Sequence, residues 1–275
     1  MGRMIGVDAG TTAIKIAIDQ GDGAEPHLLR MRVPQGAGLE ECLHRCLAQA
    51  GLTVEGAERI VLTGMRSLTF SAETLAGIPV QKVLEFEAIA RGGLLLSGET
   101  SAMVASIGTG SAFVHAGPDG NRHMGGSGVG GGTFQGLMKR LGRSYPAREL
   151  EALLEQGDLR QVDLTMGDIS PEELPGLPAY VTAANFGKVL PTARDADLIL
   201  GLTNMVFQTV GLLAAFACQA TGDTTVVAVG TLSTLKQGQR VLEAVGGLHG
   251  LRFVVPPRAA FATVLGALES AKKIG

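Results

Sequence analysis

The chain has 275 residues, enough for two modest domains with sizeable cores. Its formal net charge is −3 and only 18% of its residues are charged, which argues against a nucleic-acid-binding surface. Glycine is unusually frequent: the 40 glycines are roughly double the number that the usual share of about 7% gives for a chain of 275 residues. The glycine-rich segments therefore need an explanation.

The three cysteines, Cys42, Cys46 and Cys218, are an odd number at unrelated places, which predicts reduced thiols and a cytoplasmic protein. Cys42 and Cys46 are spaced to share one face of a helix and would supply half of a metal site. Because no further ligand stands near them in the sequence, packing in a core is the better interpretation. The first residues, Met1–Met4, lead at once into a strand pattern, so we expect no signal peptide.

The first strand pair carries the first candidate phosphate site. Met4–Val7 and Ala13–Ile18 are predicted strands, and Asp8–Thr12 forms the turn between them. An acidic residue ends a buried strand here, and the small residues and hydroxyls that follow allow a backbone to approach phosphate oxygens. Asp8 has the chemistry to hold Mg²⁺ directly or through water. A plain hairpin with a solvated aspartate fits the same residues equally well.

Strands and helices alternate through the next part of the chain, which predicts an α/β fold. We expect helices at Leu39–Ala50, Ser67–Leu75 and Ala88–Leu96, and extended segments at Arg59–Thr63 and Pro79–Leu84.

Two carboxylates, Glu85 and Glu87, stand between the extended segment and the helix that follows it. Side chains two residues apart diverge, so we expect the two acids to have different roles. Both are favoured by the helix dipole at a helix N-terminus. The functional interpretation is that one of them is a general base at the domain junction, and their positions alone do not decide which.

A second turn follows the apolar run Ala102–Ile107, which is predicted as a buried strand. The run breaks at Gly108–Ser111, a Gly-Thr-Gly-Ser turn. Another apolar run, Ala112–Ala116, then meets Pro118–Asn121, whose residues are typical of a hairpin turn. A second hairpin is therefore expected near the middle of the chain.

Apart from Ser127 and Val129, every residue from Gly125 to Gly132 is glycine. Such a loop has a high entropic cost, and we interpret its composition as functional and not as a packing requirement. With Thr133 as the N-cap of the next helix, the loop amides and the helix N-terminus are predicted to form an anion cradle. A flexible surface loop is the alternative.

The longest apolar segment, Ala196–Ala220, is nearly long enough to span a bilayer but lacks flanking basic clusters and an aromatic belt. We interpret it as a buried helix and expect it to form a homodimer interface. Further on, the chain predicts helices at Ala147–Glu155, Thr234–Val245 and Ala260–Lys272, and strands at Thr225–Val229 and Leu251–Val255.

Three turns, of the types Asp-Gly-Thr, Gly-Thr-Gly and Gly-Thr, each follow a buried strand in this order. The last is Gly230–Thr231. This arrangement resembles the actin-like ATPase superfamily, which implies two RNase-H-like α/β lobes that each offer a hairpin to the phosphates of ATP. No P-loop element is present. A Gly-x-Gly-x-x-Gly match at Gly126, Gly128 and Gly131 is interpreted as a chance match because it lacks the βαβ context.

Within this superfamily the chain resembles the type II pantothenate kinases, the class shared by bacterial enzymes of the staphylococcal type and by eukaryotic enzymes. The resemblance covers almost the whole chain and is carried by GVDAGTTAIKIAI, LEFEAIARG, IGTGS, MGGSGVGGGTFQGL, VTAANFGKVL, VVAVGTLS and AAFATVLGALES. It implies phosphorylation of pantothenate to 4′-phosphopantothenate, the first step of coenzyme A biosynthesis, with ATP and Mg²⁺. It implies a small-molecule substrate and neither a nucleic acid nor a membrane as partner.

The resemblance also implies a division of the chain. Residues 1–98 would form the first lobe, with the first hairpin and the catalytic glutamate. Residues 99–275 would form the second lobe, with the glycine-rich loop and a C-terminal helix that packs back on the first lobe.

By position, the resemblance places the catalytic base at Glu85, where it would accept the proton of the acceptor's primary hydroxyl. The residues implied to hold ATP and the metal are Asp8, which is the metal ligand, and Gly10, Thr11, Thr12, Lys15, Gly108, Thr109, Gly110, Gly130, Gly131, Gly132, Thr133 and Gly230. Those implied to contact the acceptor are Thr109, Ser111, Arg122 and His123.

The sequence departs from the family pattern on the acceptor side. The family usually has a second hydroxyl where Ala112 stands, next to Ser111, and an arginine where His123 stands, with Arg122 one place early. A neutral histidine does not give the bidentate, permanently charged contact of arginine. The first turn also reads Gly-Thr-Thr where the family prefers Gly-Gly-Thr.

Two alternatives therefore remain at the level of the sequence. One is a kinase of the same fold with another hydroxyl acceptor, and the other is a non-catalytic nucleotide-binding or regulatory protein. An activator of radical dehydratases has a similar fold but needs cysteines at a cluster that bridges a dimer, and Cys42 and Cys46 do not stand in the glycine-rich position expected for it.

Overall fold

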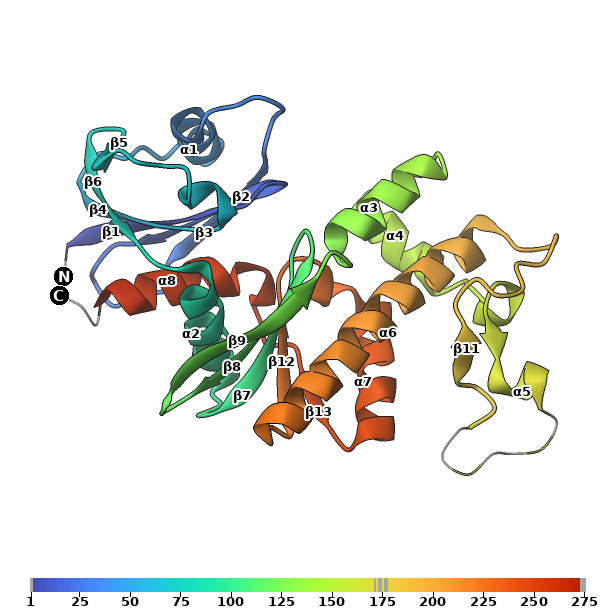
Figure 1. Ribbon diagram of the computed structural model, residues 1–275. Coiled ribbons are helices and arrows are strands. Elements are labelled where there is room, and N and C mark those ends of the chain that lie inside the picture. The colour runs from blue at the N-terminus through green and yellow to red at the C-terminus, as the bar shows by residue number, and fades with distance from the viewer. Residues whose placement is uncertain (1, 171, 173–174, 176–177, 273–275) are drawn as a thin grey trace.

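Two mixed β-sheets, one in each lobe, form the framework of the protein (Figure 1). The structure is a computed structural model and describes residues 2–170, 172, 175 and 178–272. The first sheet consists of β1 (Arg3–Ala9), β2 (Ala13–Asp19), β3 (His27–Arg32), β4 (Ala57–Thr63), β5 (Thr74–Leu75) and β6 (Ile78–Lys82). The second sheet consists of β7 (Ala102–Ile107), β8 (Ser111–Gly117), β9 (Gly120–Ser127), β12 (Thr225–Val229) and β13 (Arg252–Val254).

Helices surround these sheets, and a small two-stranded sheet extends from the second lobe. The helices are α1 (Leu39–Ala48), α2 (Glu85–Ser97), α3 (Gly131–Arg140), α4 (Ala147–Leu154), α5 (Met166–Ile169), α6 (Asp195–Thr221), α7 (Lys236–His249) and α8 (Ala262–Lys272). Short 3₁₀ turns are η1 (Met65–Ser67), η2 (Leu159–Gln161), η3 (Leu232–Thr234) and η4 (Ala259–Phe261). The small sheet pairs β10 (Leu164–Thr165) with β11 (Thr182–Ala184).

The two sheets repeat one strand pattern. In the first, β1, β2 and β3 pair antiparallel while β1, β4 and β6 pair parallel. In the second, β7, β8 and β9 pair antiparallel while β7, β12 and β13 pair parallel. Short turns can join only antiparallel neighbours, and the long connections through helices supply the parallel ones. The predicted two-lobed α/β fold is therefore confirmed.

The helices α2 and α8 cross between the lobes. Ile89 and Ala90 of α2 pack with Val104 and Val114 of the second sheet, although α2 precedes that sheet in the chain. The C-terminal helix α8 packs instead on β1, β2 and β4 of the first sheet. We keep 1–98 and 99–275 as a proposed division of the sequence, with these two helices exchanged between the lobes in space.

The crossing of α2 and α8 depends on two glycines. A Cβ on Gly92 would lie 1.9 Å from the Ala262 carbonyl oxygen, and a Cβ on Gly266 would lie 2.0 Å from the Ala88 carbonyl oxygen. Both obstacles are backbone atoms, which do not move aside as a flexible side chain does. The two helices therefore touch backbone to backbone, and this contact fixes the position of α2 against the first lobe.

The expected helix at Ser67–Leu75 is wrong. The 3₁₀ turn η1 ends at Ser67, and the segment finishes as the strand β5, which pairs antiparallel with β6. The turn between β5 and β6 contains Ala76 and Gly77, both with positive φ, which no helix accommodates. Pairing with an existing sheet outweighed a short and ambiguous apolar pattern.

The apolar helix α6 is part of the core of the second lobe. By length and composition it could cross a membrane, yet 61% of its apolar window is buried inside the protein. Val206, Phe207 and Val210 pack with β7, α3 and α7 in this core. The interpretation as a buried helix is confirmed, and its apolar composition is explained within a single chain.

Candidate active site

The end of β1 brings an acid and a lysine together at the junction of the lobes. Asp8 lies directly opposite Lys15 of β2, and the Lys15 Nζ is 3.2 Å from the Asp8 Oδ2. Both side chains are largely buried. Gly64 closes the neighbouring strand β4 with a φ of 90°, and a Cβ there would lie 2.7 Å from the Asp8 Oδ1. Only glycine leaves room for this carboxylate, a requirement that sequence reasoning missed.

Glu85 is the first residue of α2 and faces this pair. Burial, and after it the nearby negative charge of Asp8, raise the pKa of Glu85 to about 6, while Lys15 opposes the shift. Its Oε2 is buried and has no hydrogen-bond partner among the described residues. An unpaired buried carboxylate oxygen is costly, so it marks a place where an outside donor is expected.

Glu87 stands two residues on but has a different environment. Its Oε1 accepts from the Arg91 Nε at 2.8 Å, and its Oε2 accepts from the Asn121 Nδ2 at 2.5 Å. The ion pair with Arg91 spans one turn of α2, and Asn121 belongs to β9 of the second lobe. Glu87 therefore ties α2 to the second sheet, which separates the roles of the two acids in a way that their sequence positions did not.

Three threonine hydroxyls meet where the two hairpin turns approach one another. The Thr109 Oγ1, from the turn between β7 and β8, lies 3.1 Å from the Oγ1 of Thr11 and 3.1 Å from that of Thr12. Thr11 and Thr109 are exposed. Turns about a hundred residues apart in the sequence thus form one polar surface beside Asp8 and Lys15.

The glycine-rich loop enters α3 at Gly131, with Gly130 as the N-cap residue. The expected N-cap Thr133 is wrong: it lies in the first turn of the helix, and its hydroxyl donates to the Gly128 carbonyl oxygen at 2.9 Å. The amides of Gly131 and Gly132 donate to the carbonyl oxygens of Gly108 and Thr109 at 2.8 and 2.7 Å. These two amides bind the neighbouring hairpin turn and do not point freely outward.

Packing requires the glycines at the end of this loop, so the expectation that the loop glycines are not there for packing is wrong for Gly130, Gly131 and Gly132. A Cβ on Gly130, Gly131 or Gly132 would lie 2.6, 2.8 or 2.9 Å from atoms of the segment Gly108–Gly110. Gly230, with a φ of 95°, would place a Cβ 2.5 Å from the Ile107 carbonyl oxygen. The loop, the hairpin turn and the turn after β12 thus pack through backbone atoms into one glycine-lined surface.

Alternation along β8 and β9 separates the predicted acceptor residues. Ala112 and Val114 face α2, whereas Phe113 faces α6, so the neighbouring Ser111 also faces the α6 side. Its buried hydroxyl lacks a hydrogen-bond partner in the described part of the chain. Ser111 therefore does not replace the missing hydroxyl at Ala112, which points to the other face.

His123 and Arg122 are divided in the same way. His123 pairs with Val114 and stacks on Phe86, with ring centroids 3.8 Å apart and an interplanar angle of 12°. Arg122 pairs with His115, whose Nδ1 lies 2.8 Å from the Asp223 Oδ2 on the far side of the sheet. The structure therefore brings His123, and not Arg122, against Phe86, the residue that follows Glu85. The sequence did not predict the stack of Phe86 on His123, because the residues around Phe86 do not indicate which distant side chain contacts it.

The cysteines lie in the cores, as the packing interpretation predicted. Cys42 and Cys46 are buried on α1 in the first lobe, and Cys218 is buried on α6 in the second. Burial raises the pKa of Cys46 to about 11 and that of Cys218 to about 12. The thiols of Cys46 and Cys218 are therefore poor nucleophiles at neutral pH.

The repeated sheets and facing turns define the actin-like ATPase fold, and solved structures agree. The activator of the 2-hydroxyisocaproyl-CoA dehydratase from Clostridium difficile with bound ADPNP matches with a TM-score of 0.69 and 18% identity, covering 99% of this chain and 98% of that one. Component A of the (R)-2-hydroxyglutaryl-CoA dehydratase of Acidaminococcus fermentans matches with a TM-score of 0.69 and 20% identity over 99% of both chains. At these identities the matches show the fold alone.

The family follows from sequence. The profile of the Fumble family matches residues 98–240, more than half of the chain. The type II pantothenate kinase of Staphylococcus aureus (strain USA300) is 29% identical over 224 residues, which cover 77% of this chain and 79% of that protein. The chain belongs to the Fumble family, and the relationship to type II pantothenate kinases predicted from its motifs is confirmed.

Proposed function

We propose that this protein transfers the γ-phosphoryl group of ATP to the primary hydroxyl of pantothenate, giving 4′-phosphopantothenate, the first intermediate of coenzyme A biosynthesis. Family membership supports the reaction class and the acceptor. The single observation that carries the proposal is Glu85, a carboxylate with a raised pKa and an unpaired buried oxygen, beside Asp8 and Lys15 at the lobe junction.

In this proposal Glu85 is the catalytic base. Its Oε2 accepts the proton of the acceptor hydroxyl as that oxygen attacks the γ-phosphate. A pKa of about 6 leaves the carboxylate mostly ionised at neutral pH while keeping it basic enough to take a proton. Glu87 does not compete for this role because Arg91 and Asn121 already bind its two oxygens.

ATP would lie along the glycine-lined surface. The first turn offers Gly10 and the Thr11 and Thr12 hydroxyls, and the following strand β2 offers the Lys15 ammonium. The second lobe offers the turn Gly108–Gly110, the start of α3 at Gly130–Thr133 and the turn at Gly230. These segments combine close backbone approach with donors, which is what phosphate oxygens require. Because the Gly131 and Gly132 amides bind Gly108 and Thr109, their first role is to hold the turn that meets the phosphates.

Asp8 is the residue proposed to hold Mg²⁺. Among the described residues no group of three or more His, Cys, Asp or Glu side chains forms a metal cluster. A magnesium site fits nevertheless, because this ion usually binds one or two carboxylates together with water and phosphate oxygens. When bound, the ion supplies charge neutralisation on the transferring phosphoryl group. The buried Asp8 carboxylate provides the protein's share of that site.

For the acceptor we propose Thr109 and His123 as contacts. A second candidate function is phosphorylation of another hydroxyl acceptor. One observation favours it: the side chain that stacks on Phe86 is His123, while Ser111 and Arg122 face the other side of the sheet. The acceptor side of the site is thus less polar than the family pattern implies.

The test is a panel of hydroxyl acceptors, including pantothenate and pantetheine, with ATP and Mg²⁺ and the phosphorylated product detected by mass. Product with pantothenate, lost in Glu85→Gln, supports the proposal. Product only with another alcohol supports the second function. Absence of product with every acceptor, together with tight ATP binding, would leave a nucleotide-binding module.

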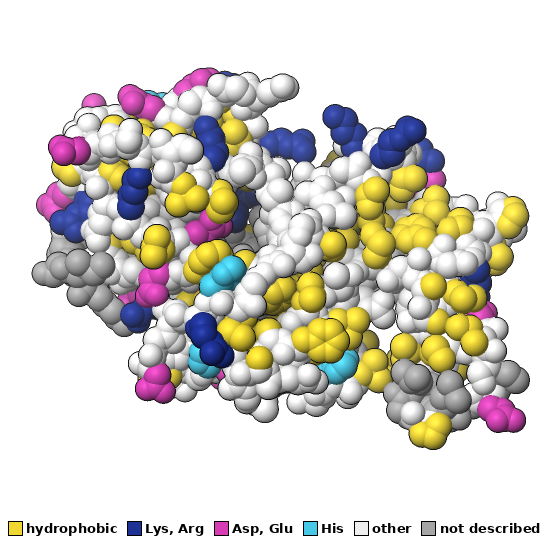
Figure 2. Space-filling model, in the orientation of Figure 1, with side chains coloured by type: hydrophobic (Ala, Val, Ile, Leu, Met, Phe, Trp, Pro, Cys, Tyr) yellow, Lys and Arg dark blue, Asp and Glu magenta, His cyan; other side chains and the backbone are white. Residues whose placement is uncertain are grey.

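We also propose that the protein is a cytoplasmic homodimer that pairs through the second lobe. Figure 2 shows hydrophobic side chains gathered over the α3 and α6 side of this lobe. Leu137 of α3, Leu141 just after it and Phe216 of α6 are 41%, 42% and 57% exposed. Exposed apolar patches of this kind are typical of interfaces. A monomer at micromolar concentration in sedimentation velocity would contradict this proposal.

A further inference from the structure

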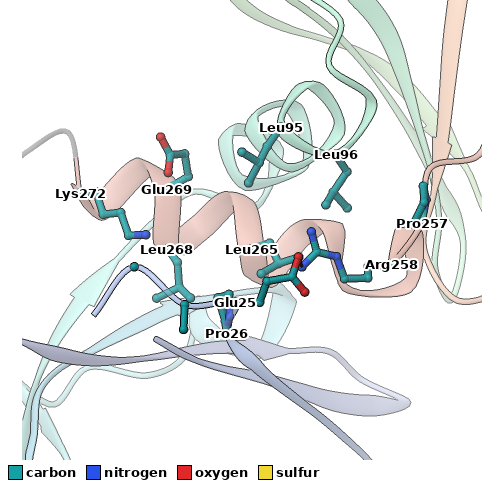
Figure 3. A pocket seen from close by; sticks show the side chains of 12 residues that line it. Glu25, Pro26, Leu95, Leu96, Pro257, Arg258, Leu265, Leu268, Glu269 and Lys272 are labelled. Atoms are coloured by element: carbon teal, nitrogen blue, oxygen red, sulfur yellow. Dashed lines mark ion pairs between the residues drawn. The ribbon is translucent and has the colours of Figure 1, made fainter. Parts of the chain in front are cut away.

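A pocket of about 370 Å³ lies away from the candidate active site, where the lobes meet behind the crossing of α2 and α8 (Figure 3). Its walls come from the turn Gly23–Pro26 between β2 and β3, the C-terminal end of α2, the loop before η4, and α8. Leu95 and Leu96 stand about 15 Å along α2 from Glu85. The size falls within the range of sites for small organic molecules.

The inner wall of this pocket is apolar. Leu265 and Leu268 of α8 form part of it and are themselves buried, while Leu95 at the end of α2 is 51% exposed. Pro26 and Pro257 add apolar surface from either lobe. In Figure 3 the leucines of α2 and the residues of the β2–β3 turn flank α8 from opposite sides. A ligand that fits this wall needs a hydrocarbon part.

Two cations line the pocket, and they differ in how firmly they are bound. The Lys272 Nζ lies 2.7 Å from the Oδ2 of the buried Asp19. Arg258 is 3.2 Å from Glu25, whose side chain is 81% exposed. An exposed ion pair contributes little to stability, so a second anion can take the place of Glu25. Arg258 thus offers a guanidinium at one end of an apolar wall.

The remaining charges limit what binds there. Glu25 and Glu269 both line the pocket, which disfavours a ligand with two negative charges. The Glu25 carboxylate already pairs with Arg258, and both residues line the pocket. The Arg258 guanidinium can therefore bind a carboxylate that lies in the pocket. Arg258 has a φ of 62°, a costly conformation outside glycine, which the surrounding loop maintains.

We propose that this pocket is a binding site for an amphiphilic monoanion, a carboxylate on a short unbranched hydrocarbon chain, with its carboxylate on Arg258 in place of Glu25 and its chain along Leu95, Leu265 and Leu268. The site goes beyond the proposed kinase reaction and shares none of its residues. Binding is measured without nucleotide or acceptor, so failure of either proposal leaves the other standing.

The test is calorimetric titration of the full chain with octanoate, octanamide, octyl phosphate and acetate. We expect octanoate to bind and acetate to show no binding, because acetate lacks the chain. Octanamide lacks the charge and should bind at least about tenfold more weakly. Octyl phosphate should also bind more weakly because Glu269 repels its second charge. No binding of octanoate, or equal binding of octanoate and octanamide, would overturn the proposal.

Two variants with opposite expected effects sharpen the test. Arg258→Gln should weaken octanoate binding about tenfold or more, whereas Glu25→Gln should strengthen it because the guanidinium loses its competitor. Arg160→Gln is the matched control: it removes an 81% exposed arginine, paired with Asp158, from a part of the second lobe outside the pocket. Equal binding by all four proteins contradicts the site. If Arg258→Gln does not fold, the Glu25→Gln result and the ligand series decide.

Discussion

The two hairpin turns at the lobe junction both join antiparallel strands, but they differ in the groups that they present. The first presents charge: Asp8 and Lys15 form a largely buried pair, and Glu85 of α2 faces it. The second presents backbone and a hydroxyl: the carbonyl oxygens of Gly108 and Thr109 hold the start of α3. In the proposed reaction, the charged side therefore supplies the base and the metal ligand, and the glycine side supplies most of the backbone surface for the nucleotide.

Removing the base on the charged side should have the largest effect. Glu85→Gln keeps the shape of the side chain but cannot take a proton, so kcat should fall by about 10²–10⁴-fold, with an unchanged Kd for ATP. Steady-state kinetics and calorimetry measure the two quantities. Glu87→Gln is the matched control and should be milder, since it weakens a contact with Arg91 on the flank of the site. An inactive Glu87→Gln beside a near-normal Glu85→Gln would reverse the assignment.

A side chain on the glycine side should affect ATP binding instead. In Gly131→Val the new Cβ would lie 2.8 Å from the Gly108 carbonyl oxygen and push α3 away from the hairpin turn. Overpacking of this kind typically costs about 1–3 kcal/mol, so ATP affinity should fall about tenfold or more. The matched control is Gly136→Ala on the same helix, where a Cβ meets nothing within 4 Å. Normal ATP affinity in Gly131→Val would mean that the loop does not position the nucleotide.

The pH dependence of the reaction should follow the ionisation of Glu85 on the charged side. Glu85 acts as a base only when ionised, and its pKa is about 6. The rate constant kcat/KM should therefore fall by about tenfold for each pH unit below pH 6. Measurement between pH 4.5 and 8 with saturating ATP gives this profile. A profile that is flat down to pH 5 would exclude Glu85 as the group that takes the proton.

The smallest expected effect is on stability, and its sign follows from the same shift. The pKa of Glu85 rises from 4.5 to about 6 on folding, so the folded protein holds the proton more tightly than the unfolded chain. Stability therefore falls as the pH rises from 4.5 to 6, and the loss persists above that. Glu85→Gln should be more stable than the wild type at pH 7.5, by about 1–2 kcal/mol, and equal to it below pH 4.5. Urea unfolding at both pH values measures the difference, and a destabilised variant at pH 7.5 would show that the ionised carboxylate is well paired.

The order of the elements was predictable from the sequence because it rests on local signals. Apolar runs of strand length, each ended by glycine and hydroxyl residues, identified β1, β7 and β12 and the turns after them. The helical spacing in Leu39–Ala50 gave α1 to within two residues at its end. The helix predicted at Ser67–Leu75 was wrong because β5 is stabilised by pairing with another strand, β6, and this contact gives little signal in the local sequence.

The site was predictable in its chemistry and not in its geometry. The sequence by itself determined which residue types stand at the turns, and with them the family and the candidate base. Only the tertiary structure decided that Glu85 keeps an unpaired oxygen beside Asp8 while Glu87 binds Arg91 and Asn121, and that His123 reaches Phe86 while Arg122 faces away. The physical reason is that burial, pairing and the face of a strand depend on neighbours far away in the chain, whereas turn and strand propensities depend on neighbours close by.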